Sequence, residues 1–89
     1  MSNISFTPDG FEDYTYWQTE DKRTLRKINK LIQDIVRNGQ TGIGSPEPLK
    51  GNFTGRWSRE IDDKNRLIYR IMDNGDIEII ECKGHYGDK

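Results

Sequence analysis

Alanine, cysteine and histidine are scarce in this chain of 89 residues, and their scarcity excludes several classes of protein. There is no alanine, one cysteine and one histidine. Cys82 alone cannot form an intrachain disulfide, and together with His85 it cannot provide the soft ligand set that zinc takes. We therefore expect neither a disulfide-stapled scaffold nor a zinc module, and no metal or cofactor is implied.

Long apolar runs and a net positive charge are also missing. No run approaches the roughly 18 residues of a membrane span, and residues 1–5 lack the pattern of a secretory signal. We therefore expect a cytoplasmic protein, without a membrane partner, that folds as one domain over residues 1–89. The formal net charge is −1, which gives no overall attraction to polyanions.

The charge is unevenly distributed along the chain. Residues 7–21 contain five acids and no base, whereas residues 22–37 contain six basic residues and one acid. The basic segment could face phosphates, although the same composition suits the solvated side of a surface helix.

The spacing of apolar residues predicts a strand, two helices and then three strands. Residues 3–6 alternate as in a strand, and Thr7 with Pro8 is typical of a helix start. The periodic stripe at residues 25–36 predicts a second helix that Asn38–Gly39 should end. Three strand-like runs follow, at residues 57–61, 66–72 and 77–83, while residues 40–55 are expected to be irregular.

The order of the elements is β-α-α-β-β-β, and it predicts an α+β fold. Two N-terminal antiparallel helices should pack on one face of a mainly antiparallel four-stranded sheet, leaving the other face partly open to solvent. Phe11, Tyr14 and Trp17 recur every three residues and are expected in the core. Cys82 is expected to be buried and unreactive.

Arginines on the last strands are candidates for holding a phosphate. Alternation along residues 66–72 places Arg66 and Arg70 on the open face, and a suitable register would bring Arg59 beside them. A sheet fixes the planar forks of such guanidinium groups. The alternative is cross-strand pairing with acids, namely Glu60, Glu78 or Glu81.

Two residues are candidates for proton transfer: Glu47, which lies between two prolines, and His85, near the end of the sequence. Glu47 lies between two prolines, so its backbone is restricted, and its carboxylate can act as a general base unless it is merely solvated. Lys50 can neutralise a nearby anion. His85 can exchange a proton near neutrality, and Tyr86 follows it. Together with an arginine, these groups comprise what metal-free RNA cleavage requires.

Six segments spread over nearly the whole chain share one family pattern: residues 14–18 (YTYWQ), 27–32 (KINKLI), 46–50 (PEPLK), 55–59 (GRWSR), 65–69 (NRLIY) and 85–86 (HY). Together they resemble the YoeB/Txe toxins of the RelE superfamily. The resemblance implies a RelE or microbial-RNase-like fold and the toxin of a type II toxin–antitoxin system. Such a toxin is a ribosome-dependent endoribonuclease that cuts mRNA in the A site without a metal and so inhibits translation.

The resemblance also implies roles for individual residues. The general base falls on Glu47, the phosphate-stabilising arginine on Arg66, the general acid on His85 and the terminal tyrosine on Tyr86. RNA would be held by two further basic residues, Lys50 and Arg59. Ribosomal RNA would be contacted by the second helix through Lys22, Arg23, Arg26, Lys27 and Lys30.

The implied partners are the ribosome, mRNA and a YefM-type antitoxin that wraps the toxin. Operator DNA would be reached only through the antitoxin, and a homodimer is compatible with the resemblance because relatives can pair. No cofactor is implied.

Three features depart from the family pattern. Residues 87–89 follow the His-Tyr pair, Gly84 stands where the family often has a bulkier side chain, and Glu60 stands where relatives often carry a second arginine. The first two favour an alternative function, in which a catalytically weakened homologue binds an antitoxin and takes part in autoregulation.

Overall fold

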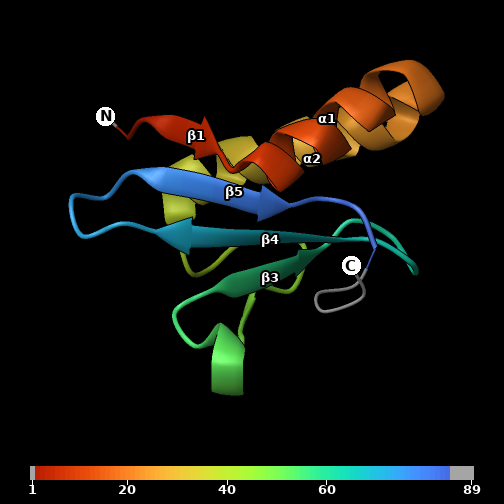
Figure 1. Ribbon diagram of the computed structural model, residues 1–89. Helices are drawn as coiled ribbons and strands as arrows, with labels where there is room; N and C mark the ends of the chain where they lie inside the picture. Colours follow the sequence, from red (N-terminus) through yellow and green to blue (C-terminus); the bar gives the residue numbers. More distant parts are fainter. Residues whose placement is uncertain (1, 85–89) are drawn as a thin grey trace.

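Residues 2–84 are described by a computed structural model of the chain, in which two α-helices lie against one face of a mixed sheet (Figure 1). The predicted α+β class is therefore confirmed. Within residues 2–84, neither helix is both long enough and apolar enough to cross a membrane. The elements are β1 (Ile4–Phe6), α1 (Pro8–Glu20), α2 (Lys22–Asn38), β2 (Glu47–Pro48), the 3-10 helix η1 (Gly51–Phe53), β3 (Trp57–Glu60), β4 (Arg66–Ile71) and β5 (Ile77–Glu81).

The start of α1 and the end of α2 lie where the sequence predicts them. The Thr7 hydroxyl accepts the Gly10 N–H at 3.0 Å and caps α1. Asp21 caps α2 by accepting the backbone N–H groups of Arg23 and Thr24 at 3.0 and 3.3 Å. Gly39 ends α2 with φ 66°, a conformation that favours glycine.

The described part of the chain has five strands, in the order β1-β5-β4-β3-β2, rather than the four expected. β3, β4 and β5 form the predicted antiparallel meander, and β1 pairs in parallel with β5. The additional strand, β2, has two residues and lies at the edge beside β3, with Glu47 opposite Ser58. The segment was expected to be irregular because Pro48 belongs to it, but an edge strand tolerates proline.

The core lies between the helices and the sheet. Ile28, Leu31 and Ile35 of α2 are buried there with Leu67 and Tyr69 of β4. Cys82 is fully buried, as expected.

The prediction for the aromatic face of α1 is correct at one end and wrong at the other. Trp17 belongs to the core and Tyr14 packs against it, but Phe11 is 57% exposed. The centre of the Phe11 ring lies 6.2 Å from that of the Phe6 ring. A spacing of three residues falls about 60° short of a full turn at each step. Phe11 therefore lies well away from the side of the helix that holds Trp17.

The start of α1 packs unusually close to β5, where the pairing with β4 shifts register between Ile68 and Tyr69. Thr7 donates its backbone N–H to the Ile79 carbonyl at 3.0 Å and its hydroxyl to the Ile80 carbonyl at 2.9 Å. A Cβ added at Gly10 would lie 2.4 Å from the Ile79 oxygen. Only glycine allows this approach, because the neighbouring atom is rigid backbone.

We expect Gly10→Ala to lower the free energy of unfolding by about 1–3 kcal/mol, the usual cost of overpacking. In an ordinary helix the same change is favourable by about 0.5–1 kcal/mol, so the sign is diagnostic. Urea denaturation of the two proteins measures the effect. Glu12→Ala, at an exposed position of the same helix, is the control and should leave stability nearly unchanged.

Candidate active site

Glu47, Ser58 and Arg66 come together on the sheet face that points away from the helices. The Arg66 guanidinium lies 3.5 Å from the Glu47 carboxylate in an ion pair and donates a hydrogen bond to the Ser58 hydroxyl at 3.2 Å. Strand register explains the meeting. Glu47 is opposite Ser58, Ser58 is opposite Ile68, and Arg66 is two residues from Ile68 along β4, so these side chains share one face.

The two charged groups differ in how firmly they are held. The side chain of Arg66 is 22% exposed and projects from a strand with neighbours on both sides, whereas that of Glu47 is 58% exposed and lies on the edge strand. A fixed guanidinium suits the stabilisation of a phosphate, and an accessible carboxylate suits the removal of a proton from a ligand. The pair thus combines a fixed cation with an accessible carboxylate, two groups that acid–base chemistry on a phosphate ester can use.

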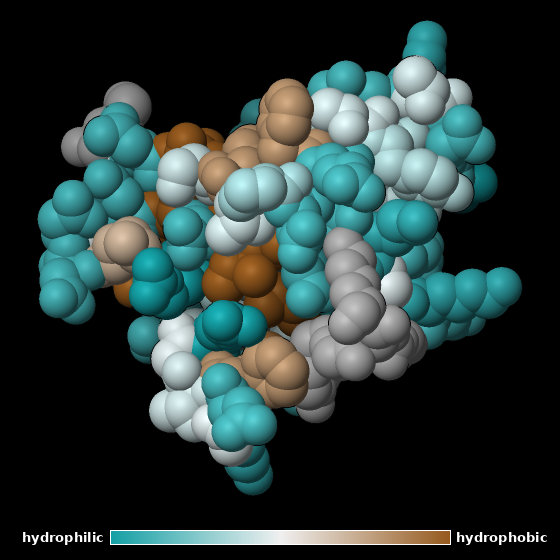
Figure 2. Space-filling model, in the orientation of Figure 1, coloured by the Kyte–Doolittle hydropathy of each residue, from teal (hydrophilic) through white to brown (hydrophobic). Residues whose placement is uncertain are grey.

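Other charges surround the pair. Glu60 is exposed and directly opposite Arg66 across the strands. Arg70 forms an ion pair with Glu78 at 3.2 Å, which is the cross-strand alternative that the sequence left open for this arginine. Lys50 is exposed at the start of η1. In the orientation of Figure 1, hydrophilic side chains cover most of the visible surface around a small hydrophobic area (Figure 2).

Arg59 does not lie on this face, so its predicted place beside Arg66 is wrong. It is opposite Leu67 and has the same orientation, towards the helices, where it is fully buried. It cannot hold RNA from there. The physical reason is the period of two: in β3, Ser58 and Glu60 face the open side, and Arg59 between them must face the core.

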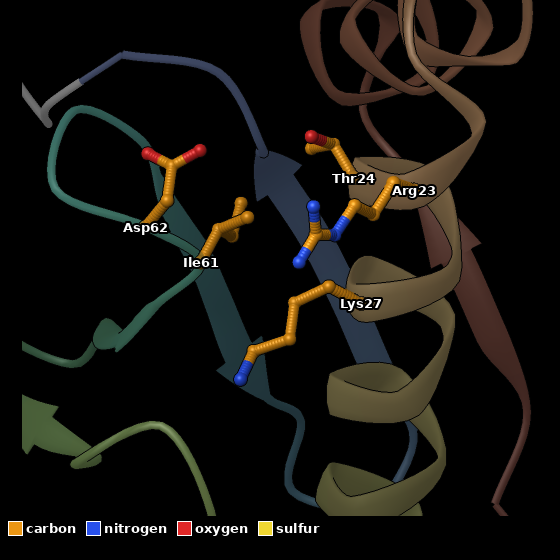
Figure 3. A pocket seen from close by; sticks show the side chains of 5 residues that line it. All are labelled: Arg23, Thr24, Lys27, Ile61 and Asp62. Atoms are coloured by element: carbon orange, nitrogen blue, oxygen red, sulfur yellow. The ribbon is translucent and has the colours of Figure 1, made fainter.

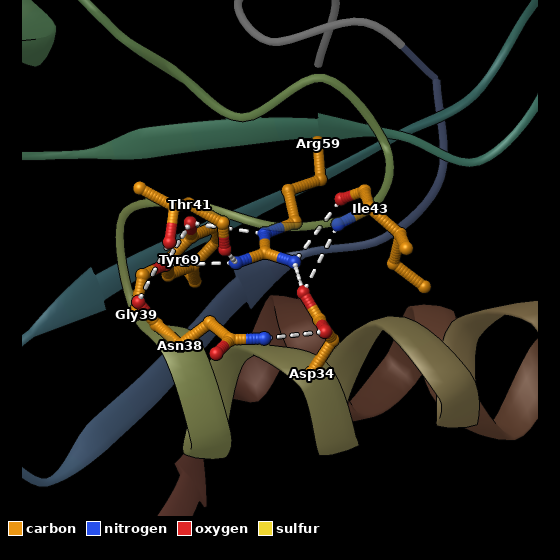
Figure 4. Close-up of polar contacts among 7 residues, drawn as sticks. All are labelled: Asp34, Asn38, Gly39, Thr41, Ile43, Arg59 and Tyr69. Atoms are coloured by element: carbon orange, nitrogen blue, oxygen red, sulfur yellow. Dashed lines mark hydrogen bonds and ion pairs between the residues drawn. The ribbon is translucent and has the colours of Figure 1, made fainter.

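All five N–H donors of the buried guanidinium are used (Figure 4). Arg59 Nε donates to the Tyr69 hydroxyl at 3.1 Å, and one terminal nitrogen binds the Asp34 carboxylate and the Ile43 carbonyl. The other terminal nitrogen donates to the carbonyls of Gly39 and Thr41, both at 2.8 Å. This network fastens the segment after α2 to β3, shortly before that segment supplies Glu47.

The same network changes the acidity of its members. The hydrogen bond from Arg59 is the main cause that lowers the pKa of Asp34 below its ordinary 3.8, with further bonds from Ile43 and Asn38. Burial raises the pKa of Tyr69 above 10.0, although Arg59 opposes the shift. Asp34 is thus held ionised and Tyr69 neutral, the states that this hydrogen-bond pattern requires.

The end of β5 is held from two sides. Trp17 donates its indole N–H to the Cys82 carbonyl at 2.8 Å, and the buried Asp13 accepts the Cys82 N–H at 3.0 Å. Gly84 contacts the beginning of β4. The predicted proton donor His85 and its neighbour Tyr86 lie outside the described residues.

The basic residues predicted to contact ribosomal RNA are all exposed along the first half of α2. Arg23 and Lys27 extend from the helix towards the β3–β4 turn and, with Thr24, Ile61 and Asp62, line a shallow pocket (Figure 3). Their solvated positions are compatible with contact to a large anionic surface. The five residues are Lys22, Arg23, Arg26, Lys27 and Lys30.

Three residues with a part in this arrangement were not predicted. Ser58 is fully buried and binds Arg66, Asp34 binds Arg59, and Asn65 binds Gly84. Alternation along β3 carried the signal for Ser58. The contacts of Asp34 and Asn65 join distant segments and leave no local pattern. Among residues 2–84, no cluster of His, Cys, Asp and Glu could hold a metal ion.

Comparison with known proteins agrees with the fold. The family described as the YoeB-like toxin of bacterial type II toxin-antitoxin system matches residues 6–86. Toxin YoeB of Streptomyces coelicolor is 46% identical over 83 residues, covering 93% of this chain and 98% of the relative. Toxin YoeB of Escherichia coli is 44% identical with the same coverage.

Solved structures give the same result. A YoeB/ParE toxin from Agrobacterium tumefaciens superposes with a TM-score of 0.91 at 40% identity, covering 94% of this chain and 99% of the other. A YoeB–YefM heterotetramer from Staphylococcus aureus gives a TM-score of 0.87 at 50% identity over 97% of this chain and 99% of the other. The fold and the comparisons together define a small bacterial toxin. The chain belongs to the YoeB family, the toxins of type II toxin–antitoxin systems.

The buried guanidinium should be essential for stability. We expect Arg59→Met to lower the free energy of unfolding by about 3–5 kcal/mol, because it removes the donor of the Thr41 and Ile43 carbonyls and leaves the Asp34 carboxylate without its cation. Chemical denaturation measures the loss. Arg70→Met removes the partly exposed ion pair with Glu78 and should cost less than about 1 kcal/mol. Equal losses in the two variants would contradict a special role for the buried network.

Proposed function

We propose that the chain is a ribosome-dependent endoribonuclease that cuts mRNA in the A site by metal-free acid–base catalysis. The observation that carries the proposal is the Glu47–Arg66 pair, 3.5 Å apart on an open sheet face. Membership of the YoeB family supports it. The substrate is a ribose-phosphate linkage whose 2′-hydroxyl acts as the nucleophile.

The proposed reaction transfers the phosphoryl group within the RNA. Glu47 takes the proton of the 2′-hydroxyl, and the 2′-oxygen forms a bond to phosphorus while the bond from phosphorus to the 5′-oxygen breaks. Arg66 stabilises the charge on the pentavalent phosphorus, and His85 gives a proton to the leaving 5′-oxygen. Lys50 neutralises the backbone nearby, and Tyr86 orients a base. The products carry a 2′,3′-cyclic phosphate and a 5′-hydroxyl.

The ribosome would be contacted by the basic half of α2, and a YefM-type antitoxin would restrain the toxin. The antitoxin partner is supported by the S. aureus relative solved with YefM. A YoeB dimer from the same organism, with a TM-score of 0.87 at 50% identity, supports a homodimer. Operator DNA would be reached only through the antitoxin.

Glu60 favours a second candidate function. Glu60 is paired with Arg66 across the strands, and its negative charge there repels an approaching phosphate. A homologue weakened in this way would bind an antitoxin without cutting mRNA.

Toeprinting of mRNA on purified ribosomes separates the two functions. The unmodified protein should produce a cut in the A site, whereas Glu47→Gln and Arg66→Met should each reduce the cleavage rate by roughly a hundredfold or more. Arg70→Met is the matched control, since it removes another arginine from the same face of β4, and it should keep nearly full activity. An unmodified protein that leaves every message intact would support the antitoxin-binding function instead.

Charge reversal on α2 tests the ribosome contact. We expect Lys27→Glu to weaken ribosome binding by about tenfold and to reduce its salt dependence, since the contact is to phosphates. The cleavage rate of mRNA on saturated ribosomes should not change. Arg37→Glu makes the same charge change at the other end of the helix and serves as the control. If Lys27→Glu binds the ribosome as tightly as the Arg37→Glu control, the first half of α2 does not form the interface.

A further inference from the structure

The β3–β4 turn holds the last described residue of the chain. Gly84 donates its backbone N–H to the Asn65 side-chain oxygen at 2.8 Å and accepts the Arg66 backbone N–H at 3.0 Å. Both of its backbone groups are therefore fixed by two consecutive residues at the start of β4. The next residue in the sequence is His85.

The Asn65 side chain can occupy only one orientation. Its amide nitrogen donates to both carboxylate oxygens of Asp62 at 3.1 Å, so its oxygen must be the acceptor for Gly84. Asp62 in turn accepts the backbone N–H groups of Lys64 and Asn65, both at 2.8 Å. The turn is thus a chain of hydrogen bonds that begins at a carboxylate and ends at Gly84.

Side chains of α1 hold the opposite side of the same short segment. Asp13 and Trp17 bind the backbone of Cys82, and the Lys83 ammonium lies 4.2 Å from the centre of the Tyr16 ring. α1 therefore fixes residues 82 and 83, and Asn65 fixes Gly84. The Gly84 φ of 75° is one that favours glycine, and its backbone bends there.

We propose that Asn65 is a positioning residue for the general acid: by holding Gly84 it sets the point from which His85 reaches the phosphate bound at Arg66. This rests on the proposed function, because it assumes that His85 donates the proton to the leaving oxygen. Arg66 follows Asn65 directly in the sequence. One turn thereby places the phosphate-stabilising group and the attachment point of the acid relative to each other, which proton transfer requires.

The first experiment measures single-turnover cleavage of mRNA on saturated ribosomes. Asn65→Ala should slow cleavage by roughly ten- to a hundredfold while ribosome affinity stays within about twofold. Asn74→Ala is the matched control, since Asn74 makes similar bonds to Asp76 in the β4–β5 turn, and it should cut like the unmodified protein. A normal rate for Asn65→Ala overturns the inference.

A double-mutant cycle separates positioning of the acid from damage to Arg66. In a His85→Ala background, Asn65→Ala should slow cleavage by less than about twofold, because the group it positions is already gone. A full additional loss would show that Asn65 acts through another group, and would overturn the inference.

A charge-preserving exchange tests the role without emptying the turn. Asn65→Asp alone brings two carboxylates together and should slow cleavage, whereas Asn65→Asp combined with Asp62→Asn restores one amide facing one carboxylate and should recover most of the rate. Circular dichroism and thermal melting confirm that each variant is folded. Amide hydrogen exchange at Gly84 should be faster in Asn65→Ala than in Asn74→Ala, and unchanged protection overturns the inference.

Failure of the proposed function gives a different result. If the unmodified protein and His85→Ala cut mRNA at the same rate, His85 is not the acid, and both the proposed chemistry and the inference fall. If His85→Ala is slow and Asn65→Ala is fast, the function stands and only the role of Asn65 is wrong.

Discussion

A single buried guanidinium connects the parts of the chain that build the site. The segment after α2 has few apolar side chains, so burial of its own surface cannot order it. Its carbonyls at Gly39, Thr41 and Ile43 instead meet at Arg59, whose charge is balanced by Asp34. A charge in this position is tolerated only because every donor has a partner. The tether that carries Glu47 starts from this anchor, which links the stability of the core to the geometry of the open face.

The two faces of the sheet therefore have separate roles, and the same strands contribute side chains to both. Towards the helices, β3 and β4 contribute Arg59, Leu67 and Tyr69 to a closely packed interior. On the opposite face, the same strands carry the buried Ser58 and the partly exposed Arg66, whose spacing follows from the strand pairing. The Arg66 guanidinium on a central strand is held firmly, while the Glu47 carboxylate on the edge strand stays accessible. This division suits chemistry on a large substrate that is itself held elsewhere.

Local patterns in the sequence predicted the elements well, because caps and periodicity act over a few residues. The start of α1 at Thr7, the end of α2 at Gly39 and the meander were all predicted. The short strand β2 was not, since its pairing depends on β3 and its proline argues against a strand. The wrong placement of Arg59 shows the limit of residue type as a guide. An arginine was expected at the surface, but alternation with Ser58 and Glu60 already placed it inside.

The topology of the sheet has a consequence for the order in which the strands can pair during folding. Among residues 2–84, β5 is the last strand along the sequence, yet it lies between β1 and β4, and β1 pairs with β5. The sheet therefore cannot close until β5 has folded back to β1, because their parallel pairing joins residues 4–6 to residues 77–79. Such long-range pairing is entropically costly, so the sheet is complete only once distant parts of the chain have met.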